Sequence, residues 1–167
     1  MKVFMKKYHI GFLAPTVYRY YQGKGFGGAE LQVVQFARMF AEAGYPVTVI
    51  TNDYGQADEE VHNGVRIVKI PLYFLGGSNL FFPFDIIRFL WRIRKLKLDY
   101  CFVKNPNSIL FLPGVSKFFC SGLKSVKIFA SNGDCKIPSG FSGLLYRLGI
   151  KVADGFIFQT EAQQQES

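Results

Sequence analysis

The chain contains no uninterrupted apolar run of the roughly 18 residues that a membrane span requires. Its first apolar run, "HIGFLAP", is too short for the core of a signal peptide and is typical of a strand. The three cysteines, Cys101, Cys120 and Cys135, form no C-x-x-C pair, and their odd number favours reduced thiols. Together these absences predict a cytoplasmic protein.

Histidine is scarce as well, and this bears on metal binding. The chain has two histidines: His9 lies inside an apolar run and His62 in a polar segment. Because metal centres need clustered ligands, we expect both to be structural. The sequence therefore predicts no metal and no other cofactor.

Composition is that of an ordinary globular domain. The 167 residues are 49% hydrophobic and 19% charged, with an unusual 18 Phe and 9 Tyr, which is enough for one domain with a real core. The net charge of +8 attracts anions such as nucleotides, lipid head groups or nucleic acid, without choosing among them.

Short apolar runs alternate with segments of helical period. The expected strands are 8–14, 46–51, 65–70, 99–103, 125–130 and 153–159. The expected helices are 29–43, 84–97 and 141–151. Within 107–121, Pro113-Gly114 should break or restart any helix. Strands that alternate with helices predict a Rossmann-like α/β fold, in which helices cover both faces of a parallel sheet.

The stretch "QGKGFGGAE" contains G-x-G-x-x-G in Gly23, Gly25 and Gly28. A dinucleotide fingerprint follows its strand directly, whereas here "PTVYRYYQGK" separates the glycines from a strand that ends near Ala14. Asp53 lies beyond the second strand, away from the usual acidic position. Two interpretations stay open: a flexible loop, or a helix start whose N–H groups meet a phosphate.

A resemblance to a known family comes from two stretches. "GGAELQVVQFARMFAEAGYPVTVITN" (27–52) resembles the first helix and second strand of the group 1 (family 4) glycosyltransferases. "KVADGFIFQTEAQ" (151–163) resembles the strand and capped helix near the end of the same amino-terminal domain, and "NGVRIVKIP" fits its third strand. The likeness extends over most of the chain and is weak at 72–98.

The resemblance implies one half of a GT-B enzyme, in which two Rossmann-like domains face a cleft. Residues 1–167 would form the amino-terminal, acceptor-side domain, and the carboxy-terminal nucleotide-sugar domain is absent from the chain. "TEAQ" (160–163) spells a capping box, so we expect a helix to begin there and the protein to continue. Members transfer a sugar from a nucleotide-sugar donor with retention and generally without a metal. We expect a bacterial-type enzyme that makes polysaccharide or glycolipid on a saccharide or lipid-linked acceptor.

The candidate binding residues follow from strand ends, where ligands of open α/β sheets collect. The resemblance places donor phosphates at Gly27 and Gly28, and Lys104 in "KNPNS" could stabilise the charge of the leaving group. The expected substrate-binding residues are Asn105, Ser131 and Gly133.

The candidate catalytic residues are Asn132 and Asp134, in the loop "SNGDC" after the fifth expected strand. Many relatives carry a histidine where this chain has Asn132, and an asparagine cannot shuttle a proton. If the acceptor hydroxyl needs a base, Asp134 is the nearby titratable group, although the leaving phosphate can serve instead. Asn-Gly-Asp is also ordinary turn chemistry.

The stretch "FFPFDIIRFLWRIRKLK" (81–97) predicts an amphipathic helix with a basic side. The simpler interpretation is a core-facing helix with a solvated face. The functional one is peripheral attachment to an anionic bilayer, on the inner face of the membrane, with Arg88, Arg92 and Lys95 on lipid phosphates. Trp91, Phe81 and Phe82 would then enter the interface.

One alternative function belongs to another class. The net charge and the aromatic residues also fit a basic nucleic-acid-binding module without catalytic activity. No RNP-like, helix-turn-helix or zinc motif accompanies them. The expected partners are therefore a nucleotide-sugar donor and its acceptor, with no nucleic acid.

Overall fold

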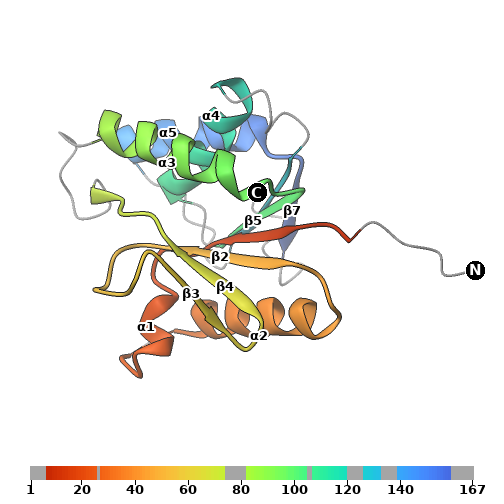
Figure 1. Ribbon diagram of the computed structural model, residues 1–167. Coiled ribbons are helices and arrows are strands. Elements are labelled where there is room, and N and C mark those ends of the chain that lie inside the picture. Colours follow the sequence, from red (N-terminus) through yellow and green to blue (C-terminus); the bar gives the residue numbers. More distant parts are fainter. Residues whose placement is uncertain are drawn as a thin grey trace, which may run out of the picture.

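The computed structural model describes residues 7–25, 27–73, 82–104, 107–119, 126–132 and 139–158. They form an α/β fold built on a seven-stranded sheet with the order β3-β4-β2-β1-β5-β6-β7 (Figure 1). The strands are β1 (Ile10–Leu13), β2 (Val47–Thr51), β3 (Glu59–His62), β4 (Val65–Lys69), β5 (Tyr100–Lys104), β6 (Lys127–Asn132) and β7 (Gly155–Phe158). The helices are α1 (Tyr18–Tyr21), α2 (Gly28–Glu42), α3 (Phe82–Leu96), α4 (Phe111–Phe119) and α5 (Gly140–Val152), with a 3-10 turn over Asn107–Leu110.

The six strands expected from the sequence run parallel, which confirms the predicted Rossmann-like sheet. β1 lies at the centre, where Phe12 pairs with Val49 of β2 and with Phe102 of β5. β4, β6 and β7 continue the parallel arrangement towards the two edges. All four residues of β1 are buried, as expected of a strand with helices over both faces.

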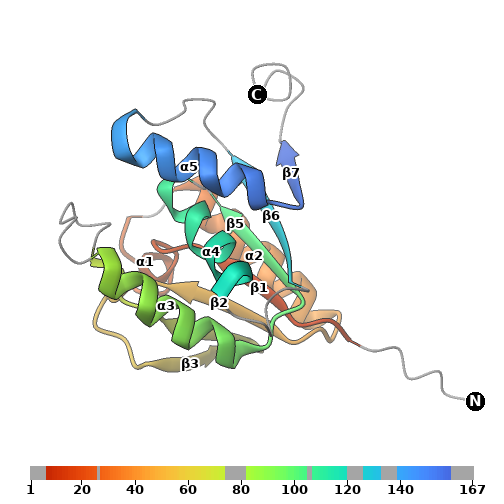
Figure 2. The ribbon, with the colours of Figure 1, turned by 90° about the horizontal axis from the view of Figure 1, so that it is seen from above.

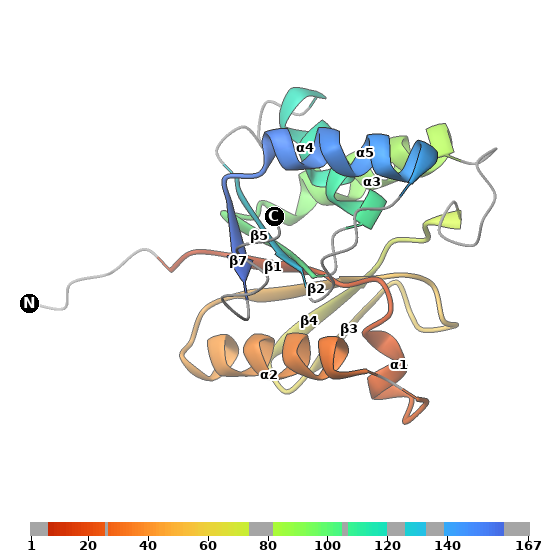
Figure 3. The same ribbon diagram turned by 180° about the vertical axis from the view of Figure 1, so that it is seen from behind.

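Helices cover both faces of the sheet. α3, α4 and α5 lie over one face, and α1 and α2 lie over the other (Figures 1 and 3). Phe89 and Ile93 of α3 belong to the first core, together with Leu13 and Val103 from the sheet. The second core lies between α2 and the sheet, and Ala37 of α2 is fully buried in it. The predicted helical period of α2 is therefore confirmed, and Gly44 ends this helix with a φ of 81°.

The structure differs from the sequence prediction at an edge of the sheet. β3 pairs antiparallel with β4 and adds a seventh strand that was not expected. Asn63 and Gly64 connect the two strands with φ of 50° and 78°, the left-handed values that a tight hairpin turn requires. The short helix α1, between β1 and the glycine loop, was also not expected.

Two further differences concern the second half of the chain. β6 is displaced by two residues from the expected strand 125–130, so that it ends at Asn132. Pro113 lies in the first turn of α4, where N–H groups lack an intrahelical acceptor, and the helix therefore restarts there and continues. Gly114 allows α4 to approach Val152 of α5 closely.

Gly149 of α5 packs closely against Leu110, the last residue of the 3-10 turn before α4. A Cβ at residue 149 would lie 2.8 Å from the carbonyl carbon of Leu110. We expect Gly149→Ala to lower the free energy of unfolding by about 1–3 kcal/mol, because the helix must move away to relieve the clash. Urea unfolding followed by circular dichroism measures the change. Gly28→Ala is the control, since a Cβ there meets no atom within 4 Å, and equal losses in the two variants would contradict this packing.

Asp154, between α5 and β7, contacts both α4 and β6. Its carboxylate accepts hydrogen bonds from Lys117 of α4, from Lys127 at 3.3 Å and from the N–H of Ile128 at 2.8 Å. Partial burial acts to raise the pKa of Asp154, but the hydrogen bonds from Lys117 and Ile128 outweigh it and lower the pKa. The folded chain therefore favours the ionised form of the Asp154 carboxylate.

This lowered pKa predicts a loss of stability in acid. The contribution of Asp154 is present above the unfolded-state pKa of about 3.9 and disappears as the pH falls through the lower folded value. We expect Asp154→Asn to reduce the free energy of unfolding at neutral pH and to weaken its further decline in acid. Urea titrations at several pH values test this, and an unchanged acid dependence in the variant would show that other carboxylates cause the decline.

Candidate functional site

The candidate site lies at the carboxyl edge of the sheet, where the parallel strands all end. In open α/β folds ligands bind outside this edge. The structure brings the start of α2, the end of β5 and the end of β6 to it. These are the three places in which the sequence analysis expected binding or catalytic residues.

The start of α2 is held by a short chain of hydrogen bonds. The N–H of Gly27 donates to the Glu30 carboxylate at 3.0 Å, and the Thr16 hydroxyl donates to the same carboxylate at 2.6 Å. Burial acts to raise the pKa of Glu30, but the bonds from Thr16 and from backbone N–H groups outweigh it, so the pKa is lowered. Glu30 is therefore ionised at neutral pH and fixes the helix start relative to the segment after β1.

Gly28 is the first residue of α2 and has open space beside it. A Cβ at residue 28 would meet no atom within 4 Å, and the same holds for Gly25 in the preceding loop. Packing against the rest of the chain thus does not require glycine at position 28. The N–H groups of Gly28 and Ala29 belong to the first helical turn, which has no intrahelical acceptors for them. This helix start can receive an anion at close range.

Lys104 ends β5 and lies beside Ser131 of β6 in the parallel register. Desolvation by burial lowers the pKa of Lys104. Lys104 also lines an apolar cavity of about 200 Å³ together with Gln32 and Val33 from the first turns of α2. Phe12, Phe36, Phe40, Phe102, Val103 and Ile157 complete the wall. The structure therefore places Lys104 and the middle of α2 at one cavity, whose lining does not include Gly27 or Gly28.

The remaining predicted site residues divide into two groups. Ser131 and Asn132 are the last two residues of β6, so they belong to a strand and not to the loop in which they were expected. The strand reaches Asn132 because β7 pairs with β6 up to that residue. Asn105, Gly133 and Asp134 lie outside the described residues, and their roles stay predictions.

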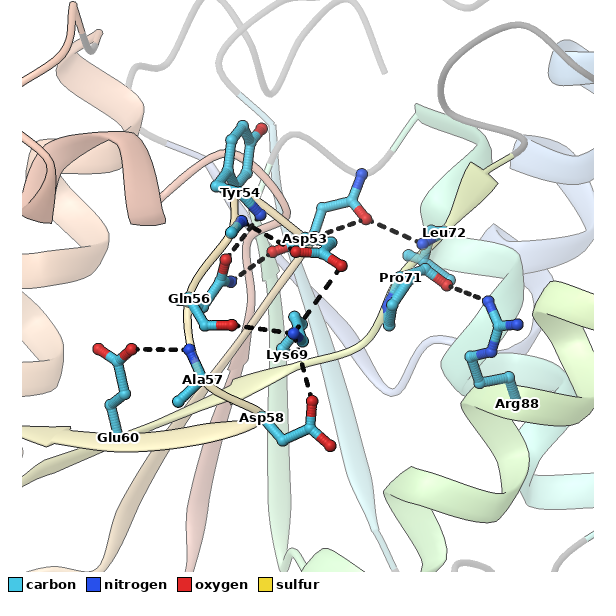
Figure 4. A network of polar contacts seen from close by, with 12 residues as sticks. Asp53, Tyr54, Gln56, Ala57, Asp58, Glu60, Lys69, Pro71, Leu72 and Arg88 are labelled. Atoms are coloured by element: carbon cyan, nitrogen blue, oxygen red, sulfur yellow. Dashed lines mark hydrogen bonds and ion pairs between the residues drawn. The ribbon is translucent and has the colours of Figure 1, made fainter.

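A second polar cluster follows β2 and β4 at the same edge (Figure 4). Lys69 donates to the carbonyl of Gln56 at 2.9 Å and lies 3.2 Å from Asp58 and 3.8 Å from Asp53. Asp53, considered above as a cofactor-binding acid, accepts the N–H of Gly55 at 2.9 Å. The local hydrogen bonds of Asp53 and its ion pair thus stabilise the loop after β2.

The cluster extends to α3 through two arginines. Arg92 forms a 2.7 Å ion pair with Asp58, and Arg88 donates to the carbonyl of Pro71 at 3.3 Å. Arg88 also stacks over Tyr73, 5.2 Å from the ring centroid. Sequence reasoning missed these pairings because the partners are far apart along the chain. They fix α3 against the ends of β2 and β4.

The histidines and the described cysteine have structural surroundings. His9 makes a 2.8 Å hydrogen bond with Thr48, and His62 pairs with Glu60 at 2.8 Å. Burial raises the pKa of the Cys101 thiol to about 12, so this thiol is unreactive. Among the described residues, no group of three His, Cys, Asp or Glu could hold a metal ion. No helix in that part of the chain is long and apolar enough to cross a membrane.

Comparisons with known proteins concern the fold and the family of the chain. Among solved structures, a putative UDP-N-acetylglucosamine 2-epimerase from Listeria monocytogenes is similar, with a TM-score of 0.57 and 12% sequence identity. The alignment covers 97% of this chain and 42% of that chain, so this chain spans less than half of its neighbour. At this identity the likeness shows the fold alone. A comparison with curated proteins gave no significant match.

A family comparison gives more than the fold. The model of Glycosyltransferase Family 4 matches residues 26–117, which include Gly27 and Gly28, α2 and β2 to β5. The match extends over more than half of the chain and confirms the resemblance seen in residues 27–52. The chain belongs to glycosyltransferase family 4.

Proposed function

We propose that the chain is the acceptor-side domain of a retaining glycosyltransferase. The enzyme moves a glycosyl group from a nucleotide-sugar donor to a saccharide or lipid-linked acceptor. Family membership and the Rossmann-like sheet support glycosyl transfer in general. The observation that carries the proposal is the start of α2, where Gly28 leaves room for a phosphate beside first-turn N–H groups that have no intrahelical acceptor.

The proposed chemistry concerns the charge of the leaving group. Transfer forms a bond between the acceptor oxygen and the anomeric carbon and breaks the bond from that carbon to the donor phosphate. Negative charge develops on the departing nucleoside diphosphate, and cations or N–H donors stabilise it. In this proposal Lys104 and the first-turn amides of α2, including that of Gly28, supply that stabilisation. Gly27 contributes mainly by position, because its own N–H already donates to Glu30.

The proton of the acceptor hydroxyl needs a destination. In retaining transfer a departing phosphate oxygen can take it, and Asp134 is the alternative base in this chain. Asn105, Ser131 and Gly133 would bind the acceptor in this proposal, and Asn132 is a candidate catalytic residue beside Asp134. No metal is invoked, because Lys104 and the helix start carry the positive potential.

The biological setting is also part of the proposal. We place the enzyme in bacterial polysaccharide or glycolipid assembly, in the cytoplasm or on the inner face of the membrane. A basic nucleic-acid module remains the alternative from another class, since net charge alone does not distinguish phosphates of different origin. Turnover of a nucleotide sugar by the longer protein would decide for the transferase.

Gly28→Val tests the helix start as a phosphate site. The branched side chain would enter the open space beside α2, so the fold should persist while donor phosphates are kept away. In the protein that includes the second half, we expect kcat to fall by about 10²–10³, as when one donor to a developing charge is lost. Donor turnover with a matched acceptor is the measurement.

Gly25→Val is the matched control, because residue 25 also has open space and a backbone that accepts valine. We expect it to retain most of the activity. Equal activity of a folded Gly28→Val enzyme and its parent would remove the helix start from the mechanism.

A separate experiment tests whether sugar transfer requires both domains. We expect residues 1–167 alone to fold but to transfer no sugar, because one half cannot position both substrates for reaction. Circular dichroism monitors folding, and release of nucleoside diphosphate monitors transfer. Robust turnover by the isolated chain would contradict the two-domain proposal.

A further inference from the structure

Three helices form one layer over the sheet, on the side away from α2. α4 contacts both α3 and α5, so the three lie next to one another in the order α3, α4, α5 (Figure 2). Their inner sides contribute to the first core. Their outer sides form a surface that is separate from the start of α2 and from the cavity.

The outer side of α3 carries large apolar side chains. The inner residues Phe89 and Ile93 are 0% and 2% exposed, as expected of a helix that packs on a sheet. On the opposite side, Phe84, Ile87 and Trp91 recur at spacings of three and four residues and are 65%, 65% and 57% exposed. These three residues form a continuous apolar stripe along the helix.

The outer side of α5 repeats this pattern. Leu145 and Tyr146 face the core, with exposures of 5% and 7%. Phe141, Leu144 and Leu148 share the opposite side at the same spacing and are 50%, 54% and 40% exposed. We call the two stripes, Phe84–Ile87–Trp91 and Phe141–Leu144–Leu148, the outer helical face.

Charge on the three helices is almost all of one sign. They contain seven Lys or Arg residues and a single acid, Asp85, which is fully buried. α2, under the sheet, contains Glu30, Glu42 and one arginine, Arg38. The layer with the outer helical face is therefore strongly basic, whereas α2, on the opposite side of the sheet, has one more acid than base.

Of the three cations expected from the sequence at this surface, Lys95 flanks the outer helical face, whereas Arg88 and Arg92 have partners elsewhere. Arg92 pairs with Asp58, and Arg88 stacks on Tyr73 and bonds to a carbonyl. Arg94 and Lys95 are exposed beside the stripe of α3, and the ammonium of Lys95 lies 3.4 Å from the centroid of the Trp91 ring. On α5, Arg147 and Lys151 are exposed beside the second stripe.

This combination fits the surface of a lipid bilayer. Single exposed apolar residues are common, but each stripe places three large apolar side chains together on one helix, with α4 between the two helices. Water solvates such surfaces poorly. In a bilayer interface, Trp, Phe and Leu enter the level between head groups and acyl chains, while Lys and Arg bind lipid phosphates. We propose that the outer helical face docks the chain on membranes that contain anionic lipids. This docking is independent of sugar transfer and can be measured without it.

The test uses the isolated chain and vesicles of equal parts phosphatidylcholine and phosphatidylglycerol. Trp91 is the only tryptophan, so its fluorescence reports directly on the outer helical face. We expect a blue shift on binding, quenching by brominated acyl chains, and release as the salt concentration rises. Vesicles of phosphatidylcholine alone should bind much more weakly.

Two variants separate the apolar contribution from the charge contribution. Leu144→Ser with Leu148→Ser should lower the partition coefficient by roughly tenfold, because two side chains no longer enter the interface. Arg94→Glu with Lys95→Glu should lower it by roughly tenfold or more and reduce the salt dependence. Met39→Ser on α2 is the control: Met39 is 61% exposed but lies on the opposite side of the sheet, and binding should not change. Circular dichroism confirms the fold of each variant.

Three outcomes would overturn the proposal. The first is vesicle binding that both double variants leave unchanged, since another surface would then be the contact. The second is a self-associating chain, shown by equilibrium sedimentation without lipid, whose dimer is lost in Leu144→Ser with Leu148→Ser. The third is binding of a single-stranded oligonucleotide through Arg94 and Lys95 with no binding to anionic vesicles.

Discussion

β1 is buried on both faces, and the strands on its two sides run parallel to it. A parallel neighbour needs a crossover connection, so each strand beside β1 requires a helix over one face of the sheet or the other. The same parallel arrangement makes the strands end at one edge. The position of the candidate site and the two layers of helices both follow from this central strand.

The two faces of the sheet have different tasks. On one side, the middle of α2 and Lys104 line an apolar cavity, and Glu30 fixes the start of α2 through Thr16. On the other side, α3 to α5 bury one side in the core and expose a basic surface with apolar stripes. Substrate chemistry and the proposed membrane contact therefore occupy separate parts of the domain. If the acceptor is lipid-linked, as proposed, membrane docking would hold the domain at the surface in which the acceptor is anchored.

The candidate site was predicted in part. Strand ends and the glycine-led helix were visible in the sequence, because hydrophobic period and glycine position are local properties. The ion pairs of Lys69 with Asp53 and Asp58 were not visible, because the partners come together only when β2 and β4 pair. Arg88 and Arg92 were expected on the outer surface, because the sequence does not show their distant partners. In the structure Arg88 contacts Tyr73 and Arg92 pairs with Asp58.

The sequence by itself determined the alternation of strands and helices, the parallel sheet and the family, since these depend on local pattern and on motifs such as "GGAE". Even the missed hairpin had a local signal, because Asn63-Gly64 is a typical two-residue turn. Only the tertiary structure decided which side of each amphipathic helix faces outward, which cations remain beside Trp91, and how far β6 extends. Those outcomes depend on contacts between residues that are distant in the chain, and periodicity within one segment does not specify them.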